Sequence, residues 1–168
     1  MNELTFRVAT EADVSFLLEL RRQTMTEHLQ RSGIEPSESE RIERVLANFD
    51  SAEIILLSGT PVGLLKVVRG EDSWDLVQIQ ILPEKQGGGL GSIILEKLLA
   101  DADEAGASVS LSVLRANPAR RLYERLGFRI VGENDKAYDM QYGRRTYRAG
   151  RGEGANSDDE KIDSGSEP

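Results

Sequence analysis

Residues 76–92, LVQIQILPEKQGGGLGS, decide how the rest of the chain can be arranged. The first seven of these residues include five aliphatic side chains, which is the composition and length of a buried strand. Pro83 has no N–H to donate to a neighbouring strand, so the strand should end just before it. Glycines at positions 87, 88, 89 and 91 then lead into a run of helical composition, residues 92–99.

A helix start with this many glycines needs a physical reason, because each glycine costs a helix about 1 kcal/mol. Anion binding supplies one, since the first N–H groups of a helix have no partner within it and glycine lets a phosphate come close. A flexible glycine turn is the other interpretation. Two common nucleotide patterns fail here: no Lys follows the glycines, and the last position of G-x-G-x-x-G/A falls on Ser92 or Ile94.

The remaining segments predict a mixed α/β chain. Alternation of apolar and polar residues, and short apolar runs, indicate strands over residues 4–9, 54–57, 62–68, 108–114, 128–131 and 137–142. Helical spacing indicates helices over residues 10–31, 37–49, 89–104 and 118–126. Within the second helix, one apolar face should contain Ile42, Val45, Leu46 and Phe49. Turns are expected over residues 59–61, which would make a hairpin, and 70–73, which would leave the start of the central strand near Trp74 exposed.

The second decisive segment, residues 117–128, reads NPARRLYERLGF. Asn117 is a good N-cap, Pro118 suits the first helical position and Gly127 suits the position after the last turn. The segment therefore predicts one short helix with well-defined ends. Tyr123 lies within it, and a tyrosine in such a helix is usually a core or boundary residue.

Composition limits the classes of function. The chain has 168 residues, a formal net charge of −8 and no cysteine. The negative charge argues against non-specific nucleic-acid binding, and the lack of cysteine excludes a thiol nucleophile and thiolate metal ligands. The chain has no apolar run of the about 18 residues needed for a membrane span and no signal peptide at its start, so we expect a cytoplasmic protein without membrane contact.

The two decisive segments together resemble the GNAT superfamily of N-acetyltransferases. Gln86, Gly89 and Gly91 fit that family's pyrophosphate-binding pattern, Q/R-x-x-G-x-G/A, and NPARRLYERLGF is similar to its last motif. The resemblance implies an α/β (α+β) domain with a mostly antiparallel twisted sheet of six to seven strands and about four helices. The two central strands would splay apart to hold acetyl-CoA. We assign this domain to residues 1–147 and expect residues 148–168 to form a disordered acidic tail.

The resemblance also implies roles for individual residues. The backbone N–H of Ile81 would donate to the developing oxyanion, and Tyr123 would protonate the departing thiolate. Asn117 would contact the pantetheine arm as well as cap its helix. The full set implied for cofactor binding is Ile81, Leu82, Gln86, Gly87, Gly88, Gly89, Leu90, Gly91, Ser92, Asn117 and Tyr123.

The general base is less clear, because many family members carry a Glu on the central strand and this chain has Gln78 and Gln80 there. Asp75 is the nearest carboxylate and is our candidate base, although it could simply be solvated, and ordered water could replace it. His28, the only histidine, is a candidate base or acceptor contact. We assign His28 and Gln78 to acceptor binding and expect no metal.

The sequence thus predicts an N-acetyltransferase that uses acetyl-CoA and a primary amine in one ternary complex. The absence of cysteine leaves no obvious acyl-enzyme route. The acceptor stays open between a small molecule, an amino acid, a polyamine and a protein N-terminus, and so does homodimer formation. The alternative hypothesis is a non-catalytic acyl-CoA-binding sensor with the same fold.

Overall fold

The computed structural model describes residues 3–32 and 37–143, with side chains left out over residues 25–36. The expected tail therefore lies outside the described residues. The chain forms β1 (Leu4–Val8), α1 (Val14–Ser32), α2 (Glu38–Leu46), β2 (Ala52–Leu57), β3 (Thr60–Arg69), β4 (Ser73–Ile81), α3 (Leu90–Ala105), β5 (Ser108–Leu114), α4 (Ala119–Arg125), β6 (Arg129–Glu133) and β7 (Ala137–Tyr142). Short 3₁₀ turns, η1 (Glu11–Asp13), η2 (Phe49–Ser51) and η3 (Pro83–Lys85), join some of them.

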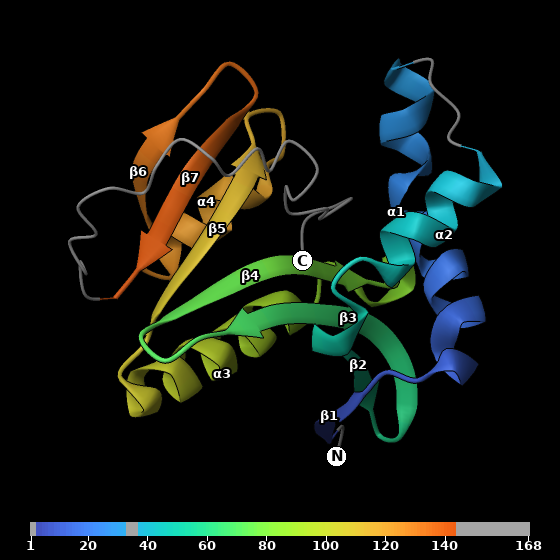
Figure 1. Ribbon diagram of the computed structural model, residues 1–168, viewed down its shortest axis with the longest axis horizontal. Helices are drawn as coiled ribbons and strands as arrows, with labels where there is room; N and C mark the ends of the chain where they lie inside the picture. The colour runs from blue at the N-terminus through green and yellow to red at the C-terminus, as the bar shows by residue number, and fades with distance from the viewer. Residues whose placement is uncertain (1–2, 33–36, 144–168) are drawn as a thin grey trace.

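The strands form one seven-stranded sheet in the order β1-β2-β3-β4-β5-β7-β6. All neighbouring pairs are antiparallel except β4 and β5, which are parallel and are connected through α3. Helices α1 and α2 cover one face of the sheet and α3 lies against the other (Figure 1). The mixed, mostly antiparallel architecture predicted from the sequence is confirmed.

The central strands splay apart. Strand β4 pairs with β5 only from Ser73 opposite Ser108 to Asp75 opposite Ser110, and beyond that point the two diverge (Figure 1). The cause is visible in the pairing of β4 with β3, where Lys66 faces Gln78 but Val67 faces Leu76. Val77 is therefore an extra, unpaired residue. Such a bulge bends its strand and increases its twist, and here it lies two positions beyond Asp75, the last residue paired with β5.

The bulge also changes which side chains of β4 face the core. Trp74 and Leu76 before it, and Ile79 and Ile81 after it, all belong to the larger core cluster, which also contains residues of α3 and α4. Two positions separate Leu76 from Ile79, so the inserted residue resets the alternation. The expectation that the strand start near Trp74 is exposed is wrong for Trp74, which is buried in this cluster, whereas Asp75 is exposed.

Helix α2 is shorter than predicted. Its chain leaves the helix at Ala47, whose ψ of 128° is extended, so Phe49 falls in η2 and outside the helical period. Val45 is buried against α1 and the sheet, but Leu46 is 48% exposed. The expected apolar face of this helix is therefore only partly formed, although Ser37 does cap it by accepting from the N–H of Glu40.

The β2–β3 hairpin turns at Ser58 and Gly59 and not at residues 59–61. Both turn residues have positive φ, 50° and 81°, which is the conformation of a two-residue hairpin turn that matches strand twist. Pro61 belongs to β3, at the register shift opposite Ile55 and Leu56, where a missing N–H is tolerated.

Candidate active site

The last residues of β4 have backbone groups that face the gap between β4 and β5, which we call the splay, and these groups are not paired with β5. The N–H of Leu82 donates to the Val62 carbonyl on β3 at 2.9 Å. Peptide groups of successive residues in a strand point to opposite edges, so the N–H and C=O of Ile81 face away from β3, toward β5. Among the described residues the β4–β5 ladder stops at Asp75, which leaves this N–H without a strand partner.

Gln86 ties the glycine loop to this edge. Its Nε2 donates to the Ile81 carbonyl at 2.8 Å, across the turn made by η3. The sequence placed Gln86 in the loop by its resemblance to the family pattern and did not foresee this bond. The bond fixes the start of the loop directly beside the N–H of Ile81.

The glycines give the loop a backbone that other residues would strain. Gly87 and Gly89 have φ of 81° and 84°, and Gly89 is the N-cap of α3. A Cβ added at Gly87, Gly88 or Gly89 would meet nothing within 4 Å, so the space above the loop is open. Gly88 does not have positive φ, so its backbone conformation does not require glycine.

The first turn of α3 is arranged for an anion. The 16-residue helix has no side-chain cap at Gly89 and no acidic residue in its first turn. Its free N–H groups and the positive end of its dipole point out of this turn. Leu90 packs at the margin of the core, Gly91 is buried and Ser92 is half-buried, so the backbone of the turn is held firmly while its end faces the loop.

Across the splay, Asn117 and Tyr123 are positioned by α4. Asn117 Oδ1 accepts from the N–H of Ala119 at 2.9 Å, which confirms its capping role. The Tyr123 side chain is fully buried and packs edge-on against Phe128, with ring centroids 5.6 Å apart. The positive φ of Gly127, 105°, ends the helix as expected. Tyr123 thus lies within the larger core cluster and not on an open surface.

The structure does not bring Asp75 to the splay. Asp75 is exposed at the paired end of β4, where its Oδ1 accepts from Ser110 Oγ at 2.6 Å. Ile81 lies six positions further along the chain, which is on the order of 20 Å along an extended strand. A base at that distance could not reach an amine held near Ile81, so Asp75 is not carried into the proposal below.

Gln78 lies under α2, opposite a lysine that the sequence analysis overlooked. Lys66 is 1% exposed, and its Nζ donates to the carbonyls of Ala47 at 2.6 Å, Val45 at 2.9 Å and Arg44 at 3.3 Å. These groups form the C-terminal end of α2, whose carbonyls attract a cation. The signal was a charged residue in the middle of an otherwise apolar strand. Lys66 fixes the end of α2 over β3, and Gln78 lies opposite Lys66 on β4.

Gln80 lies on the central strand, where many family members carry a Glu, and His28 was predicted to contact the acceptor. Gln80 is 3% exposed, and its Nε2 has no hydrogen-bond partner among the described residues. It lies opposite Leu64, whose cluster includes residues of α1. The side chain of His28 lies outside the described residues, although its backbone belongs to α1.

The start of α1 is anchored by an ion pair. Both carboxylate oxygens of Asp13 accept from the Arg7 guanidinium at 2.7 Å, and one also accepts from the N–H of Thr10. The hydrogen bonds from Arg7 are the main cause that lowers the pKa of Asp13 to about 2, and the Thr10 N–H adds to them, although burial acts in the opposite direction.

On the other face of the sheet, the Tyr142 hydroxyl donates a hydrogen bond to the carboxylate of Asp103 on α3. This hydrogen bond raises the pKa of Tyr142.

Two negative findings concern the described residues only. In this part of the chain no group of three or more His, Cys, Asp or Glu side chains is arranged to hold a metal ion. None of the helices in it is both long and apolar enough to cross a bilayer.

Comparison with known proteins decides the family. Residues 47–130, half of the chain, match the model of the acetyltransferase (GNAT) domain. The chain belongs to the GNAT acetyltransferase family. The matched region of this GNAT chain runs from the end of α2 into β6 and so contains the splay, the glycine loop and α4.

A curated relative and two solved structures are similar to this GNAT chain. The [Ribosomal protein bS18]-alanine N-acetyltransferase of Haemophilus influenzae is 39% identical over 75 residues, 44% of this chain and 51% of the relative. The match therefore spans about half the length of that relative. The PaiA N-acetyltransferase of Thermoplasma acidophilum, solved in complex with coenzyme A, is 16% identical with a TM-score of 0.67, covering 84% of this chain and 99% of its own. An acetyltransferase from Thermus thermophilus is 24% identical with a TM-score of 0.66, covering 84% and 98%. These two structures confirm the fold, and the family relationship supports an acyl-CoA co-substrate.

Proposed function

We propose that this protein is an N-acetyltransferase that transfers the acetyl group of acetyl-CoA directly to a primary amine. The observation that carries the proposal is the unpaired backbone edge at Ile81, which lies beside a glycine loop and a helix start free of acidic residues. One of these features alone would be a general anion site. Together they suit a molecule with a pyrophosphate at one end and a reactive carbonyl at the other.

The glycine loop is the proposed pyrophosphate site. The N–H groups of residues 87–91 would bind the phosphate oxygens, and the open space above Gly88 leaves room for them. Leu82 and Ser92 flank this loop, and Asn117 lies on the opposite side of the splay, where the pantetheine arm would run. Gln86 acts through the Ile81 carbonyl, by holding the loop against the strand.

The reaction forms one bond and breaks another. The amine nitrogen attacks the thioester carbonyl carbon, and the charge that develops on the carbonyl oxygen is stabilised by the N–H of Ile81. The C–S bond then breaks and the sulfur takes a proton from Tyr123, with reference pKa values of about 10 for Tyr and about 8.5 for a thiol. The proton lost by the amine passes to solvent in this proposal, because the structure does not bring Asp75 to the site.

The acceptor proposed first is a peptide N-terminal amine. The curated relative at 39% identity is named for acetylating an alanine of a ribosomal protein, and its match includes 44% of this chain. Helices α1 and α2 border the splay on the side from which an acceptor would approach (Figure 1). Gln78 lies opposite Lys66, which binds the end of α2, and His28 belongs to α1.

Release of free coenzyme A from acetyl-CoA tests the proposal. The acceptor panel contains a peptide with an N-terminal alanine, the same peptide with a blocked N-terminus and one internal lysine, a polyamine and free amino acids. Turnover on the first peptide and not on its blocked form is the expected result. Turnover on another amine would keep the enzyme and change the acceptor. Saturable acetyl-CoA binding without turnover on any amine would contradict transfer and favour an acyl-CoA sensor.

A further inference from the structure

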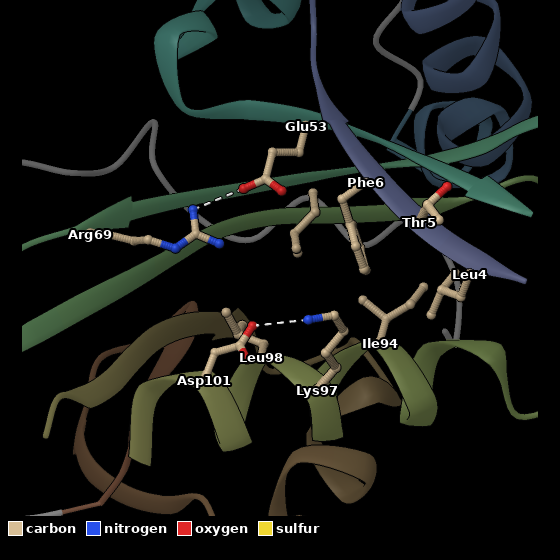
Figure 2. A pocket seen from close by; sticks show the side chains of 10 residues that line it. Leu4, Thr5, Phe6, Glu53, Arg69, Ile94, Lys97, Leu98 and Asp101 are labelled. Carbon is tan, nitrogen blue, oxygen red and sulfur yellow. Dashed lines mark hydrogen bonds and ion pairs between the residues drawn. The ribbon is translucent and has the colours of Figure 1, made fainter. Parts of the chain in front are cut away.

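A cavity lies between the sheet and α3, under the edge made by β1 (Figure 2). Its volume is about 430 Å³, which is within the range of about 300–1,000 Å³ typical of sites for small molecules. The lining residues come from β1, β2, β3 and α3, and they include none of the residues proposed to bind acetyl-CoA. The cavity is therefore a separate site, and its test does not depend on acetyl transfer.

One end of the cavity is apolar. Leu65, Ile94 and Leu98 are buried and form its inner wall, while Leu4 and Phe6 are half-buried at the margin of the core. Leu4 and Ile94 face each other across the opening in Figure 2. An apolar group placed here would remove the exposed parts of Leu4 and Phe6 from water, which is favourable in proportion to the area covered.

The other end is charged and balanced. Arg69 donates to Glu53 at 2.9 Å on the sheet side, and Lys97 donates to Asp101 at 3.2 Å on α3 (Figure 2). Lys97 Nζ also lies 5.7 Å from the centre of the Phe6 ring, so this ammonium stands between the charged and the apolar end. Both ion pairs are partly exposed, and such pairs contribute little stability, so their opening to a ligand costs little.

We propose that this cavity binds a free α-amino acid with an apolar side chain. Its carboxylate faces Lys97 and Arg69, its ammonium faces Glu53 and Asp101, and its side chain lies against Phe6. The balance of charge selects a zwitterion, because a ligand with one charge would satisfy only the residues of opposite sign. The apolar wall selects a branched or aromatic side chain over hydrogen.

Calorimetric titration with L-leucine and with L-phenylalanine tests this site. The comparison ligands are glycine, which lacks the apolar group, and isopentylamine and isocaproate, which each lack one charge of leucine. We expect saturable binding of leucine or phenylalanine with a dissociation constant below about 10 mM. Each comparison ligand should bind at least about fivefold more weakly, as expected for one lost apolar group or one partly exposed ion pair.

Two variants locate the binding. Leu98→Phe fills the cavity from its inner wall and should abolish leucine binding. Lys97→Met keeps the length of the side chain but removes its charge, and should weaken binding at least about threefold. Lys136→Met makes the same chemical change between β6 and β7, away from the cavity, and should bind leucine as the wild type does. Lys97→Met alone decides the question if circular dichroism shows that Leu98→Phe does not fold.

Three results would overturn the proposal. The first is no saturable binding of either amino acid up to about 10 mM. The second is leucine binding that survives both Lys97→Met and Leu98→Phe. The third is equal binding of isopentylamine or isocaproate, which would show that the balanced charges do not select a zwitterion.

Discussion

Strands β4 and β5 are hydrogen-bonded neighbours at one end and separated at the other. At the paired end, Asp75 lies opposite Ser110 and accepts from its hydroxyl at 2.6 Å. At the splayed end, Ile81 has no strand partner on the β5 side within residues 3–32 and 37–143, and its carbonyl is bound instead by Gln86. The same two strands thus form an ordinary sheet in one half, and in the other half β4 has backbone groups that are not paired with β5.

The difference shows how a sheet can provide backbone groups for binding when two neighbouring strands separate, without any catalytic side chain on those strands. A single extra residue, Val77, separates the two halves of β4. It bends the strand and keeps Ile79 and Ile81 in the core, so the splay opens without exposing apolar side chains. We therefore expect the splayed end to contain the residues that take part in acetyl transfer, and the residues of the paired end to have structural roles only. Four variants, ordered by expected effect, can break or sharpen this comparison.

Gly88→Glu should have the largest effect on the splayed end. The change places a carboxylate where the pyrophosphate is proposed to lie, and should lower acetyl-CoA affinity by at least about 10²-fold, measured by calorimetry. Gly88 lacks positive φ, so the variant avoids the backbone strain that a change at Gly89 would add. Gly88→Ala is the matched control and should bind within about threefold of the wild type, because its Cβ meets nothing within 4 Å. Wild-type affinity in the Glu variant would place the pyrophosphate elsewhere.

Tyr123→Phe should lower kcat by about 10²-fold, which is the low end of the contribution of one general acid. The KM for acetyl-CoA should change by less than about twofold, because a lost proton donor acts in the transition state and not in binding. Tyr142→Phe is the control, since that hydroxyl donates to Asp103 on α3. An unchanged kcat in Tyr123→Phe would remove this residue from the acid role.

The anchor of α1 should respond to acid. The pKa of Asp13 is lowered to about 2 in the folded protein by Arg7, so the pair stabilises the fold above the unfolded pKa of about 3.9 and loses this effect as pH falls toward 2. Because Arg7 is 43% exposed, we expect about 1–2 kcal/mol and not the full shift. Urea unfolding at several pH values should show Asp13→Asn less stable than wild type near pH 5, with most of the difference lost near pH 2, where about half of the Asp13 carboxyl is protonated in the folded protein. A constant difference at all pH values would contradict the ion-pair account.

Asp75→Asn should have the smallest effect. The Asn oxygen can still accept from Ser110, so the free energy of unfolding should change by less than about 0.5 kcal/mol. Turnover should stay within about threefold of wild type, because the residue lies at the paired end. A loss above about tenfold, with stability unchanged, would make Asp75 the base predicted from the sequence and end the distinction between the two halves.

Local signals in the sequence predicted much of the fold. The strand over residues 108–114, the helix that follows the glycines and the ends set by Asn117 and Gly127 all depend on neighbouring residues and are confirmed. What the sequence did not predict depends on contacts between distant segments. Val77 is unpaired only because of its register with β3, and Lys66 meets α2 about twenty residues away in the chain.

For the candidate site too, some features could be predicted from the local sequence and others depend on contacts between distant segments. The glycine loop follows from local composition, and Tyr123 from the motif that surrounds it. The separation of Asp75 from Ile81 follows from where β5 stops pairing, and the link from Gln86 to Ile81 follows from the path of the turn between them. A sequence motif therefore identifies candidate residues but does not give the distances between them. Any role that requires two residues to be in contact could be assigned only from the structure.

Amide NMR spectra recorded during an acetyl-CoA titration test the central claim most directly. The account predicts saturable shifts at Ile81 and at residues 87–92, with the amides of Thr5 on β1 and Gly132 on β6 unchanged, since these strands form the two edges of the sheet. Shifts at the edges without any at Ile81, or no shifts at saturating acetyl-CoA, would contradict it.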